Sequence, residues 1–158
     1  MIVRFVYFAI GPMKALRVLA SLALFLASLA ALADVTFKTS SVKVGPHSLK
    51  VELAAQEPQR EQGLMYRKSL GRDDGMLFIF EETSEHTFWM HDTLIPLDLI
   101  FLGDDRGVVG VVANAAPQTD TARAVKEPSR YVVEVSGGEA AAHGVAGGTR
   151  AVFVAVEE

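Results

Sequence analysis

Apolar and polar side chains alternate over the part of the chain that follows residue 34. Apolar residues occupy every second position in three short runs: Val35 and Phe37, then Val42 and Val44, then Leu49, Val51 and Leu53. A period of two is typical of half-buried strands, and Gly45-Pro46 supplies a turn between two of them. Short apolar runs predict six more strands, at residues 76–80, 87–91, 97–102, 108–113, 131–135 and 150–156.

One segment has the spacing of a short helix. Pro58 stands at a favourable first helical position, and Arg60 and Arg67 lie two turns apart on one face. We therefore predict a short helix over residues 58–66. Gly63 inside this helix costs roughly 1 kcal/mol relative to alanine, so we expect another part of the chain to pass too close to it for a side chain.

Many short strands with one helix predict an all-β fold, either a sandwich or a barrel, in a single domain over residues 34–158. The polar segment 115–130 has no clear period. We interpret this segment as a surface loop that borders a functional cleft.

The N-terminus has the order of an export signal. Lys14 and Arg17 precede an apolar stretch at residues 18–29, which is followed by the small-residue step Ala31-Leu32-Ala33. This order predicts a signal peptide over residues 1–33, removed by a cut between Ala33 and Asp34. The mature domain is then periplasmic or secreted, with no membrane contact after the signal is removed.

Two alternatives concern the same segment. A membrane anchor is disfavoured because residues 18–33 are fewer than the ~20 strongly apolar residues that cross a bilayer. Initiation at Met13 in place of Met1 would leave a more ordinary signal, and we favour Met13 as the start.

Composition restricts the chemistry. The chain has no Cys, which excludes thiol catalysis, disulfides and Cys-ligated metal. The predicted signal holds three basic residues and no acidic one, so its removal takes the net charge from −4 to −7. An acidic surface repels phosphate backbones, and we predict no nucleic-acid partner. No cofactor motif is present and none is predicted, and the sequence leaves the oligomeric state open.

Four motifs stand close together in the middle of the chain. They are R-E-Q-G-L-M-Y-R at residues 60–67, G-M-L-F-I-F at 75–80, F-W-M-H-D-T at 88–93 and I-P-L-D-L-I-F at 95–101. With these motifs the chain resembles the family known as domain of unknown function 192, over most of the predicted mature chain. The resemblance implies a sandwich or barrel of jelly-roll character with one short helix. It implies no substrate, because the activity of that family is not established.

One position departs from the family pattern. Members usually carry Asn two residues after the W-M pair, whereas this chain has Asp92. An amide both donates and accepts hydrogen bonds, and an ionised carboxylate only accepts them. Any ligand contact that the family makes through this amide is therefore altered here.

Asp98 is the strongest candidate for chemistry. Strand alternation places it on the face of Ile100 and Leu102, where a carboxylate must be paired or must have a raised pKa. One interpretation is structural: a buried salt bridge or a cap for backbone N–H groups. The other is functional, a ligand contact or general base beside Arg67 or Arg60.

Six further residues complete the predicted site. Arg60 and Arg67 are suited to hold a carboxylate or phosphate, although one of them pairing with an acidic neighbour is an equal alternative. Trp89 with His91 forms a candidate stacking surface, the alternative being that Trp89 anchors the core. Thr93 completes the set with Asp92.

The sequence therefore predicts an exported β domain that binds a small polar or anionic ligand in a cleft between helix and strands. The predicted ligand contacts are Arg60, Arg67, Trp89, His91, Asp92, Thr93 and Asp98. An alternative is a hydrolase or lyase with Asp98 and His91 as an acid–base pair. A second alternative is a Cu(I) carrier that uses Met65, Met76, Met90, His86 and His91, although Met is normally core filler and no metal site is predicted.

Overall fold

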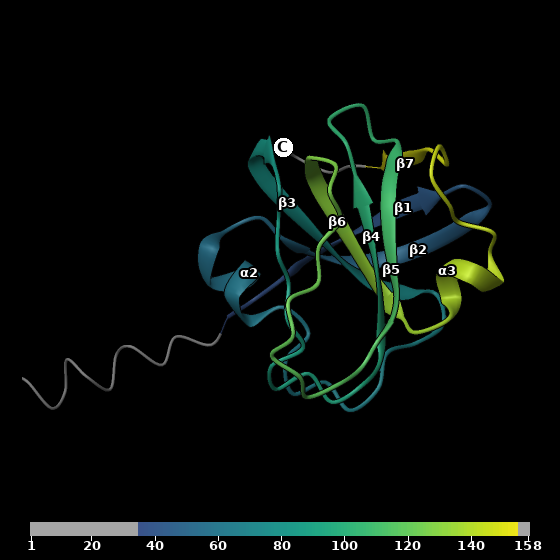
Figure 1. Ribbon diagram of the computed structural model, residues 1–158. Helices are drawn as coiled ribbons and strands as arrows, with labels where there is room; N and C mark the ends of the chain where they lie inside the picture. The colour runs from purple at the N-terminus through teal and green to yellow at the C-terminus, as the bar shows by residue number, and fades with distance from the viewer. Residues whose placement is uncertain (1–34, 155–158) are drawn as a thin grey trace, which may run out of the picture. The chain divides into compact units, whose positions relative to one another are not determined.

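The computed structural model describes residues 35–154, and the predicted signal peptide lies outside these residues. Seven strands and two short helices follow one another along the described chain (Figure 1): β1 (Lys38–Val44), β2 (His47–Ala54), α2 (Glu57–Gln62), β3 (Asp74–Ser84), β4 (Leu97–Leu102), β5 (Val108–Ala115), β6 (Ser129–Ser136), α3 (Glu139–Ala142) and β7 (Ala151–Val154). The predicted mainly-β fold with a short helix is confirmed. No helix among residues 35–154 has the length and apolar character needed to cross a membrane.

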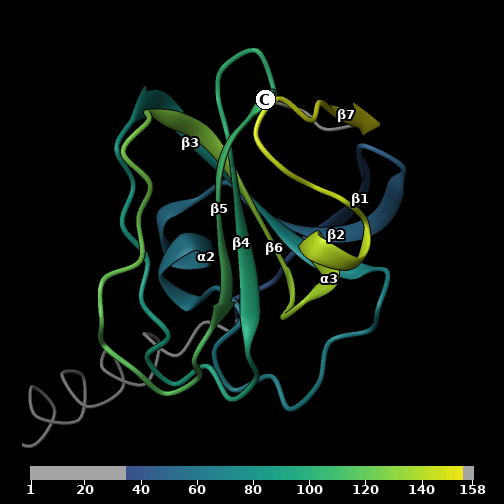
Figure 2. The ribbon, with the colours of Figure 1, turned by 45° about the vertical axis from the view of Figure 1, so that its right-hand side comes forward.

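All seven strands belong to one sheet in the order β5-β4-β6-β3-β2-β1-β7. Neighbours are antiparallel except β2 and β3, which are parallel and are joined through α2. The edge strands β5 and β7 are connected at their first residues. Gly107 and Arg150, which precede these strands, form an isolated β-bridge, and the Val108 N–H donates to the Thr149 carbonyl at 2.7 Å. The sheet therefore curls into a half-barrel, closer to the predicted barrel than to two stacked sheets. Figure 2 shows β5, β4 and β6 side by side, with α3 next to them.

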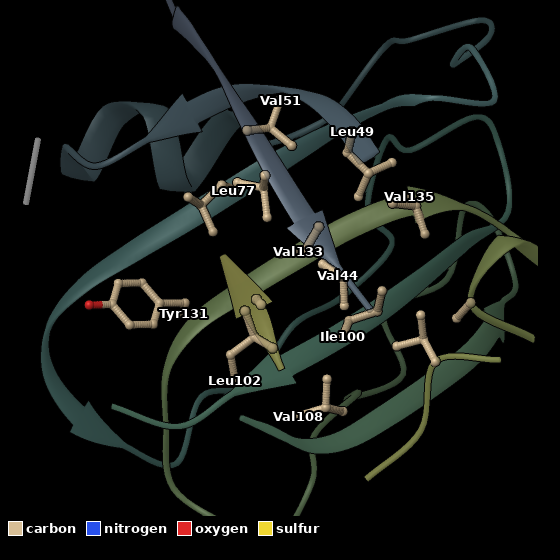
Figure 3. Packing of buried hydrophobic residues seen from close by; sticks show 14 of the residues in the cluster. Val44, Leu49, Val51, Leu77, Ile100, Leu102, Val108, Tyr131, Val133 and Val135 are labelled. Atoms are coloured by element: carbon tan, nitrogen blue, oxygen red, sulfur yellow. The ribbon is translucent and has the colours of Figure 1, made fainter. Parts of the chain in front are cut away.

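Both faces of this sheet are covered by apolar side chains. The cluster on the face of α3 includes Ile100, Tyr131 and Val133 (Figure 3). The cluster on the opposite face, toward α2, includes Phe78 and Leu99. Because the central strands are buried on both faces, their sequences are nearly continuous apolar runs.

Strand β4 has the bounds that the sequence predicts, and all six of its residues are buried. Leu97, Leu99 and Phe101 point to the face of α2. Ile100 and Leu102 point to the other face, as predicted from strand alternation.

Helix α2 ends earlier than predicted, at Gln62 instead of residue 66. The reason is Gly63, whose φ of 48° is rarely adopted by residues with a side chain. A Cβ at Gly63 would lie 3.3 Å from Cζ of Phe78 on β3. The predicted close approach of another segment is thus confirmed, and the approaching group is the Phe78 ring.

The predicted strand at residues 87–91 is wrong. Phe88 exchanges backbone hydrogen bonds with Arg123, and the Met90 N–H donates to the Thr119 carbonyl at 2.9 Å. The two paired positions are two residues apart on the first segment but four residues apart on the second. This spacing does not match, so a regular β-ladder cannot form. Residues 87–91 are instead a segment that runs beside the loop at residues 116–125.

Candidate functional site

A pocket of about 460 Å3 opens where α2 faces β3, β6 and the segment at residues 86–93. Its size lies within the range of roughly 300–1,000 Å3 that is usual for small-molecule sites. Its wall combines aromatic and aliphatic side chains with polar and charged ones. The lining residues used below are Arg60, Phe80, His86, Trp89, Thr93 and Glu134.

Glu134 is the polar group of the pocket that is buried most deeply. It lies on β6 with only 4% of its surface exposed, opposite Met76 on β3 and Leu99 on β4. Within residues 35–154 its carboxyl has no hydrogen-bond or ion-pair partner. Burial raises the pKa of Glu134 from 4.5 to about 8. The carboxyl is therefore mostly protonated at neutral pH, when it both donates and accepts hydrogen bonds.

His86 presents an uncharged ring to the same pocket. Its ring stacks on Phe80 with 3.5 Å between centroids. Burial lowers the pKa of His86, and hydrogen bonds to the backbone of Glu82 and Ser129 partly offset that effect. The stack thus forms a flat, largely neutral wall at physiological pH.

Arg60 lines the pocket but is already paired. Its guanidinium donates to the backbone carbonyls of Ala55 and Ile79, and to the Glu57 carboxylate at 2.7 Å. These contacts hold α2 against the end of β2 and against β3. The charge of Arg60 is therefore compensated within the protein, which leaves it a weak anchor for an anion.

Trp89 and Thr93 also line the pocket, as the sequence predicts. The indole of Trp89 is 62% exposed, so it lies at the mouth and is not a core anchor. The Thr93 side chain is buried, and its hydroxyl donates to the His91 carbonyl at 3.2 Å. The structure thus brings three of the seven predicted residues together: Arg60, Trp89 and Thr93.

Arg67 and His91 do not line the pocket. The guanidinium of Arg67 donates to the Glu52 carboxylate on β2, with 2.7 Å from Nη2 to Oε1. Nδ1 of His91 lies 2.8 Å from Oδ1 of Asp120, and this contact is the main cause of the raised pKa of His91. Each of these two residues forms an ion pair at the protein surface.

Asp92 has a conformational role. Its φ of 49° lies in the left-handed region, where Asn and Asp are several times more frequent than other non-glycine residues. Its carboxylate accepts a hydrogen bond of 2.7 Å from the Tyr66 hydroxyl, and this bond raises the pKa of Tyr66. The exchange of the family's Asn for Asp92 therefore preserves the backbone turn and does not alter the pocket lining.

Asp98 is fully buried on the sheet face opposite the pocket. Its carboxylate accepts three backbone N–H groups, from Asn114 at 2.7 Å and from Gly138 and Ala140 at 2.9 Å each. This arrangement matches the structural interpretation, a cap that fixes α3 and the end of β5. Neither Asp98 nor His91 lines the pocket, so the structure does not support the predicted acid–base pair in that cleft.

The soft-metal alternative gains no support from the methionines. Met76 and Met90 are fully buried in the apolar cluster on the face of α2, where they act as packing residues. Met65 lies at the pocket, and the ring of His86 is stacked on Phe80.

Glu134 is the residue that sequence reasoning missed. It stands in the run Y-V-V-E-V, where alternation alone places it on the face away from Tyr131 and Val133. That face looks solvent-exposed from the sequence, because only the sheet order shows that β6 lies between β3 and β4. The available signal was a lone acidic residue inside a strand that is otherwise apolar.

Two solved structures are similar to this chain. One is a candidate transcription regulator from Sinorhizobium meliloti 1021, with 36% sequence identity and a TM-score of 0.73, covering 77% of this chain and 98% of the other. The second is a protein of unknown function from Novosphingobium aromaticivorans DSM 12444, with 34% identity and a TM-score of 0.71, covering 75% and 94%. No curated protein matches the chain.

A family model also matches the chain. The model is DUF192, described as "Uncharacterized ACR", and it matches residues 39–153, which include every strand except the first residue of β1 and the last of β7. The resemblance inferred from the four motifs is confirmed. This chain belongs to the DUF192 family.

Proposed function

We propose that this protein binds a small organic molecule in the pocket between α2, β3 and β6. The molecule has an apolar or aromatic body and a polar group that donates a hydrogen bond to Glu134. The observation that carries the proposal is a buried carboxyl, in the wall of a pocket of about 460 Å3, that has no partner among residues 35–154. A buried polar group without a hydrogen bond costs about 1–3 kcal/mol, and a ligand donor would remove that cost.

The charges of the pocket favour an amine or hydroxyl group over an anion. Glu57, Glu61 and Glu134 line it, and the basic side chains there are Arg60 and His86. Arg60 is compensated by Glu57. Of the polar or anionic ligands expected from the sequence, we therefore favour the polar ones.

The remaining walls suit a flat apolar body. Phe80 with its stacked His86 forms one surface, and Phe88 packs edge-on against Phe80 with 6.3 Å between centroids. Trp89 lies at the mouth, where its indole can cover a bound ring. Aromatic walls with a few converging polar groups are the usual composition of small-molecule sites.

Three probes of nearly equal size test the proposal: benzylamine, benzyl alcohol and benzoate. Trp89 is the only Trp in the chain, so its fluorescence reports on the pocket mouth. We expect saturable quenching or enhancement with benzylamine and benzyl alcohol, and markedly weaker binding of benzoate at pH 7. Glu134→Gln should weaken benzylamine binding, because the variant cannot supply a negative charge.

The matched control is Glu81→Gln, which removes an exposed carboxyl of β3 that does not line the pocket. It should bind all three probes like the wild type. Equal affinity of wild type and Glu134→Gln for benzylamine, or strongest binding of benzoate, would contradict the proposal.

Export of the domain is part of the proposal as well. It rests on the order of basic, apolar and small residues before Asp34. N-terminal sequencing of the protein recovered from the cell envelope should begin at Asp34. A mature protein that retains residues 13–33 would contradict removal of the signal.

The name of the Sinorhizobium protein suggests gene regulation for that protein. For this chain a net charge of −4 gives no electrostatic support for binding DNA. We therefore do not extend that role to it.

A further inference from the structure

Two histidines and a glutamate meet on the side of the sheet opposite the pocket, at the start of β2 and along α3. His47 opens β2, Glu139 opens α3, and His143 caps the C-terminal end of α3. One ligand atom from each residue can be chosen so that all three atoms lie within 4.8 Å of one another. The three residues are buried or half-buried, in contrast to the exposed ion pairs elsewhere on the surface.

The contacts inside this cluster keep the imidazoles together. The rings of His47 and His143 are stacked with 3.6 Å between centroids. Nε2 of His143 lies 3.2 Å from Oε2 of Glu139, and Nε2 of His47 lies 3.1 Å from Oδ1 of Asp73. Two imidazoles beside a carboxylate form a ligand set that suits a divalent cation.

The fold positions the cluster through Asp98. The three N–H groups bound by the Asp98 carboxylate include those of Gly138 and Ala140, on both sides of Glu139. The first turn of α3 is thus tied to β4, and Glu139 and His143 follow four positions apart on one side of that turn. Asp98 therefore holds α3 in place, and α3 carries Glu139 and His143, two of the three residues of the cluster.

We propose that His47, Glu139 and His143 bind a divalent transition-metal ion, for which Zn2+ is the probe. Zinc bound by imidazole nitrogen and carboxylate oxygen has bonds of about 2.0–2.2 Å, which in a tetrahedron separate the ligand atoms by about 3.4 Å. Zinc binding would therefore require the three ligand atoms, which now lie within 4.8 Å of one another, to move closer together and the stacked rings to separate. Asp73 then acts as the carboxylate that orients His47, an arrangement common around zinc.

Arg72 supplies a competing cation. Its Nε lies 3.5 Å from Oε2 of Glu139. Replacing Arg72 by Gln removes this competitor, so the variant should bind Zn2+ more tightly than the wild type. If Arg72 only stabilised the fold, its replacement would not strengthen metal binding.

Calorimetric titration of the protein expressed from the full chain, with Zn2+ at neutral pH, tests the site. We expect one saturable site in the wild type and its loss in both His143→Gln and Glu139→Gln, each shown by circular dichroism to be folded. Asp73→Asn should weaken binding about 10–100-fold, the usual effect of an orienting carboxylate. The use of two variants keeps the test decisive if one of them does not fold.

The matched control is His91→Gln, which removes an exposed histidine that also contacts two carboxylates, those of Asp120 and Asp92. It should bind Zn2+ like the wild type. Absence of saturable binding to the wild type, or unchanged binding in His143→Gln and Glu139→Gln, would overturn the inference.

Discussion

The substitution Glu134→Gln tests whether the buried carboxyl of Glu134 has a raised pKa. The pKa of Glu134 is about 8 in the folded protein, and the ordinary value is 4.5. Between these values the folded state holds a proton that the unfolded state has released. The free energy of unfolding therefore falls as the pH rises, from full stability below pH 4.5 to the greatest loss above pH 8. Gln has nearly the same shape and cannot ionise, so the variant lacks this loss.

The magnitude follows from the size of the pKa shift. Each pH unit between the two pKa values changes the free energy of unfolding by about 1.4 kcal/mol. From pH 5 to pH 8 the wild type should therefore lose about 3 to 4 kcal/mol relative to Glu134→Gln. Solvent screens this effect very little, because Glu134 is only 4% exposed.

Urea unfolding of both proteins, followed by far-ultraviolet circular dichroism at pH 5, 6, 7 and 8, measures this difference. The other charged or ionisable side chains of the pocket, Glu57, Glu61, Arg60 and His86, are present in both proteins, so their effects largely cancel in the difference. A stability difference that stays constant across this pH range would refute the reasoning. It would mean that Glu134 ionises like an exposed carboxyl.

Three further substitutions test other parts of the structure. Asp98→Asn weakens the bonds to three backbone N–H groups and should lower the free energy of unfolding by about 3 kcal/mol in urea. A loss below about 1 kcal/mol would contradict the capping role. Gly63→Ala imposes a strained φ of 48° and crowds Phe78, so it should cost about 1–3 kcal/mol, and a stabilised variant would be unexpected. Asp92→Asn should leave stability nearly unchanged and lower the pKa of Tyr66 toward its ordinary value in an ultraviolet titration, whereas an unchanged pKa of Tyr66 would show that the bond to Asp92 is absent in solution.

The sequence predicts most of the strands because their signals are local. Strand β4 is apolar on both faces, and alternation assigned Asp98 to the face of Ile100 and Leu102. Strand alternation could not show which groups bind the Asp98 carboxylate. The three N–H donors come from β5 and from the start of α3. Both the structural and the functional interpretation of Asp98 were therefore compatible with the sequence.

The parallel pairing of β2 with β3 and the position of β6 are long-range features. They decide which faces of the strands are covered, and so they decide that Glu134 is buried. A Glu in an alternating strand has the same sequence pattern whether its face meets water or a pocket. The same limit applies to His47 and His143, which are far apart in the sequence and meet only when α3 packs near the start of β2.

A titration of the Glu134 side chain by carboxyl carbon-13 NMR, with and without benzylamine, tests the central claim most directly. In the free protein the midpoint should lie near pH 8. Saturating benzylamine should lower this midpoint, because a bound ammonium group stabilises the ionised carboxylate. A midpoint near 4.5 that benzylamine does not change would contradict both the buried carboxyl and its role in the pocket.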